Sequence, residues 1–66
     1  MAEGRLDQIN EHFAHVTGLL EDAHEIAVVG QSSRLSLEAL MEQTKALRQA
    51  VDRASAMVLV IESLVS

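Results

Sequence analysis

The chain contains no cysteine, no proline, no tryptophan and no tyrosine, and its only aromatic residue is Phe13. Without cysteine it can form neither a disulfide framework nor a thiolate metal site. All-β domains of this size rely on aromatic and β-branched residues and on frequent turn signals, which are scarce here. These absences exclude a disulfide-stabilised scaffold and point away from an all-β fold.

A phosphate-binding loop is also missing, although residues 26–38, IAVVGQSSRLSLE, begin like one. A P-loop needs a second glycine, a lysine and a serine or threonine at fixed distances from the first glycine. Counted from Gly30, those positions hold Leu35, Ser36 and Leu37. A nucleotide fold also needs a parallel sheet covered by helices, for which 66 residues are too few. The stretch therefore indicates helix, turn and helix.

Basic residues are few, since ten acidic side chains outnumber five basic ones and give a net charge of −5. This balance disfavours nucleic acid and anionic membranes as partners. The longest apolar run, AMVLVI at residues 56–61, is far shorter than the roughly 20 residues of a membrane span. The polar start, MAEGRLDQ, does not match a secretory signal. We expect a cytoplasmic protein without a membrane span.

Apolar residues, in contrast, are plentiful and recur at alternating spacings of three and four. One series is Leu6, Ile9, Phe13, Val16, Leu20, Ala23, Ala27 and Gly30; the other is Leu37, Leu40, Thr44, Leu47, Val51, Ala54, Val58, Ile61 and Val65. Such a seam is typical of helices that pack by knobs into holes. The sequence predicts an all-α fold, a single antiparallel hairpin over residues 1–66. Its helices span about 3–29 and about 33–64, with a turn at about 30–33.

The predicted helix ends have suitable residues. Gly30 fits the end of the first helix, where a left-handed residue is common. Ser32 or Ser33 can accept a hydrogen bond from the first free N–H groups of the second helix. With the fold-back point between residues 33 and 34, Phe13 is expected to face Ala54, a large side chain against a small one.

A third apolar column lies beside this seam and makes each helix too apolar for a lone hairpin. Its members are Leu19, Ile26, Ala50, Met57 and Leu64. An apolar stripe this wide belongs to a bundle. The sequence therefore predicts that two hairpins associate along this column into a four-helix bundle, as a homodimer or a higher homo-oligomer. The opposite flank, which includes Thr17, is expected to face water.

Further apolar residues occupy outer positions near both ends of the predicted hairpin. They are Val28, Val29 and Leu35 at the turn, and Leu59 and Val60 near the chain ends. An antiparallel two-fold dimer brings one chain's turn to the other's ends and can cover both patches. The alternative is that a patch binds another protein.

Three histidines fall in the first helix. Glu11, His12 and His15 lie within one helical turn and can in principle hold a divalent ion. Glu21 and His24 have the Glu-x-x-His spacing of di-iron bundles, but the second helix offers no matching pair. We interpret these residues as ordinary surface residues, so no metal, cofactor or catalytic residue is predicted. A helical metal-binding protein using His12 and His15 is one alternative.

In outline, two heptad helices joined by a short turn in 66 residues resemble the Rop family of small plasmid RNA-loop binders. The resemblance covers the whole chain as a pattern. It implies an RNA-binding regulator with a basic and polar face on its first helix, where this chain has Arg5 and no lysine. That function is the other alternative. The main expectation is a small non-catalytic oligomerisation or protein-interaction module, an adaptor or regulator.

Overall fold

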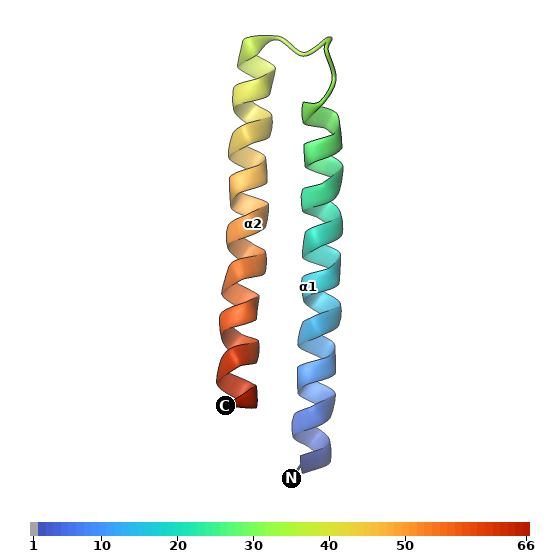
Figure 1. Ribbon diagram of the computed structural model, residues 1–66, viewed down its shortest axis with the longest axis vertical. Coiled ribbons are helices and arrows are strands. Elements are labelled where there is room, and N and C mark those ends of the chain that lie inside the picture. The colour runs from blue at the N-terminus through green and yellow to red at the C-terminus, as the bar shows by residue number, and fades with distance from the viewer. Residues whose placement is uncertain (1) are drawn as a thin grey trace.

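The computed structural model describes the backbone of residues 2–66 and the side chains of residues 4–66. It contains two α-helices of equal length, α1 (Ala2–Gly30) and α2 (Leu37–Val65), which lie side by side and antiparallel (Figure 1). The rod measures 52 × 14 × 11 Å. The predicted all-helical hairpin is confirmed. Neither helix has an apolar stretch long enough to cross a lipid bilayer within residues 2–66.

The first helix ends without the left-handed glycine that was expected. In residues 2–66 no glycine has a positive φ, and Gly30 is the last residue of α1. The N–H groups of Gln31 and Ser32 donate to the carbonyls of Val28 and Val29, both at 3.1 Å. These i to i−3 bonds tighten the last turn and satisfy two carbonyls that the helix leaves free. The left-handed cap is therefore not needed.

The second helix begins four residues later than predicted, at Leu37. Its N-cap is Ser36, whose hydroxyl accepts a hydrogen bond from the Ala39 N–H at 3.1 Å. Ser32 instead accepts from the Arg34 N–H at 3.3 Å and stabilises the turn itself. The expected cap at Ser32 or Ser33 is wrong, because the helix begins directly after Ser36. Glu38 supports this start, since a carboxylate in the first turn interacts favourably with the helix dipole.

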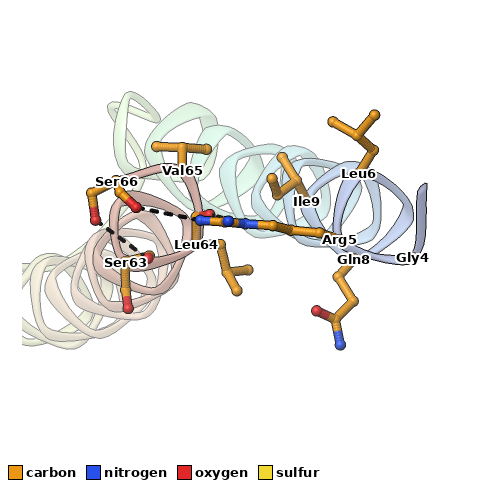
Figure 2. A pocket seen from close by; sticks show the side chains of 9 residues that line it. All are labelled: Gly4, Arg5, Leu6, Gln8, Ile9, Ser63, Leu64, Val65 and Ser66. Atoms are coloured by element: carbon orange, nitrogen blue, oxygen red, sulfur yellow. Dashed lines mark hydrogen bonds between the residues drawn. The ribbon is translucent and has the colours of Figure 1, made fainter. Parts of the chain in front are cut away.

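Arg5 joins the two helices at the open end of the hairpin. Its Nε donates to the Leu64 carbonyl at 2.6 Å, and its Nη2 donates to the Ser66 carbonyl at 3.3 Å (Figure 2). The last turn of α2 has no basic residue of its own. Arg5 therefore supplies, from α1, the positive charge that the carbonyl end of a helix favours.

The helices pack through a different pair of columns from the predicted seam. The buried and half-buried residues of α1 are Ile9, His12, Val16, Leu19, Ala23, Ile26 and Gly30; those of α2 include Leu40, Gln43, Leu47, Ala50, Ala54, Met57, Ile61 and Leu64. Leu6, Phe13 and Leu20, which were predicted inside the seam, are exposed. The 3-4 spacing is kept, but each helix is rotated so that the third apolar column turns inward.

The register is shifted as well, by about one helical turn. A fold-back point between residues 33 and 34 would bring Leu6 level with Ile61, but Leu6 lines the hollow at the open end together with Ser63, Leu64, Val65 and Ser66. The later start of α2 accounts for the shift. One heptad from that level, Phe13 is level with Val58 and not with Ala54 as expected; two heptads from it, Leu20 is level with Val51.

Little of the single chain is buried. Within residues 4–66 the buried side chains are Ala23, Ala50, Ala54 and Ile61. Three of these four are alanines, which contribute little apolar area. The single hairpin therefore does not enclose a hydrophobic core of its own.

Candidate oligomerisation surface

One long side of the hairpin is apolar along its length, with Thr44 as its one polar member. We call it the open apolar face; it consists of Leu6, Phe13, Leu20 and Ala27 of α1 and Leu37, Thr44, Val51, Val58 and Val65 of α2, all exposed. Each set has a seven-residue spacing, so it forms a column along its helix. Phe13 is 54% exposed and Leu20 is 53% exposed. These are the residues of the predicted seam that the rotation of the helices leaves outside.

The two columns lie on the same side of the hairpin. In an antiparallel pair, the positions flanking the contact on a given side are equivalent in both helices. Figure 2 shows this at the open end, where Leu6, Ile9 and Val65 point to one side and Gln8 and Leu64 to the other. The open apolar face is therefore one surface built by both helices.

The opposite side of the hairpin is polar along its middle, and one heptad beyond Asp22 and Arg53 it exposes Val29 and Val60. A shallow groove there runs between the helices, and its lining includes Asp22 and Glu25 from α1 and Gln49 and Arg53 from α2. All four side chains are exposed. The hairpin thus has one mostly apolar side and one side that is polar along its middle, the division expected of a helix pair that forms half of a bundle.

Two threonine hydroxyls beside and within the open apolar face already have partners. Thr44 donates to the Leu40 carbonyl at 2.8 Å, and Thr17 donates to the Phe13 carbonyl at 3.1 Å. A buried hydroxyl without a partner is costly. Because both hydroxyls bond within their own helix, the face can lose water without leaving these groups unpaired.

The five residues predicted at an oligomer interface lie between α1 and α2 of one chain. Ala50 is buried, and Leu19, Ile26, Met57 and Leu64 are half-buried. They hold the hairpin together in the structure. The exposed apolar column of α1 is instead that of Leu6, Phe13 and Leu20, which was predicted to lie between the helices.

The two predicted end patches are partly exposed. Val28, Val29, Leu59 and Val60 are among the exposed large apolar residues, and Leu35 is half-buried. Val28 and Leu59 follow Ala27 and Val58 directly and so point outward, away from the other helix. They lie beside the open apolar face rather than within it.

The histidines do not gather into a metal site in the part of the chain that the structure describes, where no group of three or more His, Asp or Glu side chains could hold an ion. His12 is half-buried between the helices, whereas His15 and His24 are exposed. Glu11 is exposed as well. His12 thus lies at the contact between the helices, whereas His15, three residues further along the same helix, faces solvent.

A second concave feature is a hollow at the open end of the hairpin (Figure 2). Arg5 is the only charged side chain among the nine described residues that line it. Its guanidinium already donates to two main-chain carbonyls. The hollow therefore offers no free charged group for a ligand, and the open apolar face is the stronger candidate.

No protein-family model, no curated protein and no solved structure matches the chain.

Proposed function

We propose that the chain is a small non-catalytic oligomerisation module, an adaptor or regulator that works as a homo-oligomeric helical bundle. The observation that carries the proposal is the open apolar face. Among residues 4–66, twelve large apolar side chains are more than 40% exposed, and seven of them belong to this face. Soluble monomers rarely expose a continuous apolar surface of this kind.

The exposed area supports a second copy as the partner. The single chain exposes 5261 Å². A compact monomer of 7.2 kDa is expected to expose about 4,100 Å², so the excess is about 1,100 Å². A stable interface covers roughly 800 Å² on each partner. The excess is therefore enough for one interface along the rod, and a partner hairpin of the same length and apolar width matches it.

The polar side favours this function over Rop-like RNA binding. An RNA-binding face needs cations to pair with phosphates. The groove on the polar side has two acidic side chains, Asp22 and Glu25, and one cation, Arg53, and the net charge of the chain is −5. A water-facing, acidic outer surface suits a bundle whose apolar sides meet each other.

A charge placed on the open apolar face tests the proposal. We expect the unmodified protein to sediment at twice 7.2 kDa, or a higher multiple, at micromolar concentration. Leu20→Glu should shift it to monomer, because each interface would then bury two unpaired carboxylates at a cost on the order of several kcal/mol each.

Leu59→Glu is the matched control, since Leu59 is also a largely exposed leucine, at 63%, but lies outside the face. It should leave the oligomer intact. A monomeric unmodified protein would contradict the proposal. If Leu59→Glu dissociated the oligomer and Leu20→Glu did not, the interface would have to be assigned to the end patch that contains Leu59.

A further inference from the structure

Resting on the proposed self-association, we infer that the second copy docks on the open apolar face with its turn at the opposite end, so that α1 lies on the partner's α1 and α2 on the partner's α2. Two hairpins can stack face to face with two-fold symmetry in two ways, and the inferred arrangement is one of them. In the second arrangement, both turns lie at the same end and α1 lies on the partner's α2. Three features of the face separate the two arrangements.

The first feature is the size gradient along the face. Near the open end, Leu6 and Phe13 are large, whereas Ala27 and Thr44 near the turn are small. With both turns at one end, large residues would meet large ones and small would meet small, which leaves a void near the turn. With the turns at opposite ends, Phe13 comes opposite the partner's Ala27, and Thr44 comes opposite the partner's Val58. Each of these pairs sets a larger side chain against a smaller one, as dense packing favours.

The second feature is Leu37, which at 75% is the most exposed large apolar residue of the described chain. It is the first residue of α2 and lies past the end of α1 at Gly30. With both turns at one end it would project toward the partner's turn, where no helix is available to cover it. In the opposite arrangement it approaches the partner's Val65 at the end of α2.

The third feature is the charge along the edge of the face. Arg48 and Glu62 lie one heptad either side of Ser55 on the outer edge of α2, and both are exposed. When α2 lies antiparallel on the partner's α2 with Leu37 near the partner's Val65, Arg48 comes opposite the partner's Ser55, about two helical turns from the partner's Glu62 on the same edge. With both turns at one end, Arg48 instead comes level with the partner's His24, which offers no negative charge. Complementary edge charges fix the orientation of a pair.

Spin labels at the turn distinguish the arrangements, and the absence of cysteine means that each variant carries a single label. Ser33→Cys places the label on an exposed turn residue. In the inferred arrangement the two Ser33 sites lie roughly 40–50 Å apart, close to the length of a 29-residue helix. With both turns at one end they lie roughly 10–20 Å apart, about the spacing of packed helices plus the labels.

A label at a second position gives the inferred arrangement a short distance of its own to be detected. Gln8→Cys labels an exposed position near the open end. In a mixture of Ser33-labelled and Gln8-labelled chains, dipolar spectroscopy should detect a separation of roughly 10–20 Å between different chains. A short Ser33–Ser33 distance in a protein of dimeric mass overturns the inferred orientation and leaves the oligomerisation function standing. Monomeric mass with no dipolar coupling overturns both.

Discussion

Removing the only aromatic side chain gives a quantitative test of the open apolar face. Phe13 is 54% exposed in the single hairpin, so about half of its apolar surface stays in water until a partner covers it. Truncating a buried phenylalanine to alanine costs about 3–5 kcal/mol. About half of this cost is then a loss of association free energy, which is about 1.5–2.5 kcal/mol per chain and about 3–5 kcal/mol per dimer.

Phe13→Ala should therefore raise the dimer dissociation constant by about two to three and a half orders of magnitude, at about 1.4 kcal/mol for each tenfold change. Sedimentation equilibrium over a range of concentrations measures this constant directly. Leu59→Ala is the control; a substitution at an exposed site outside the face should change it by less than about fivefold. Equal effects of the two substitutions would refute the assignment of Phe13 to the interface.

Two further substitutions test the helices themselves, both by thermal unfolding at a fixed protein concentration. Ser36→Ala removes the hydroxyl that accepts from the Ala39 N–H and should destabilise the fold by about 1 kcal/mol. Ser33→Ala should change little, and an equal loss would show that Ser36 is not the cap. Gly18→Ala should stabilise the fold by about 0.5–1 kcal/mol, because a Cβ there meets nothing within 4 Å. A lower melting temperature would mean that Gly18 is in close contact in the assembled protein.

The hairpin could be predicted from the sequence because two uninterrupted heptad series leave room for only one turn. The start of α2 was misplaced because three serines lie within the turn. One signal in the sequence favours Ser36: Leu35 and Leu40 occupy the positions before and after it that a hydrophobic staple uses. Both residues are half-buried in the structure.

The inward-facing column could not be predicted in the same way. Each helix has three adjacent apolar columns, such as those containing Leu20, Val16 and Leu19. Periodicity identifies the three and places Val16 in the middle. Whether Leu19 or Leu20 then turns toward the other helix depends on the side to which the chain folds back, and this is set by tertiary packing rather than by spacing. The sequence thus predicts a bundle-forming stripe but not which flank joins which helix.

The small buried set described above, three alanines and one isoleucine, has a consequence for how much of the protein a cell must make. A chain with so little interior gains little free energy by folding alone. When folding and association are one event, the folded fraction depends on the total concentration of the chain. Below the dissociation constant, newly made chains stay open to proteases, and above it they protect one another. The rate of synthesis would then act as a threshold, and small changes in expression near it would produce large changes in the amount of assembled protein.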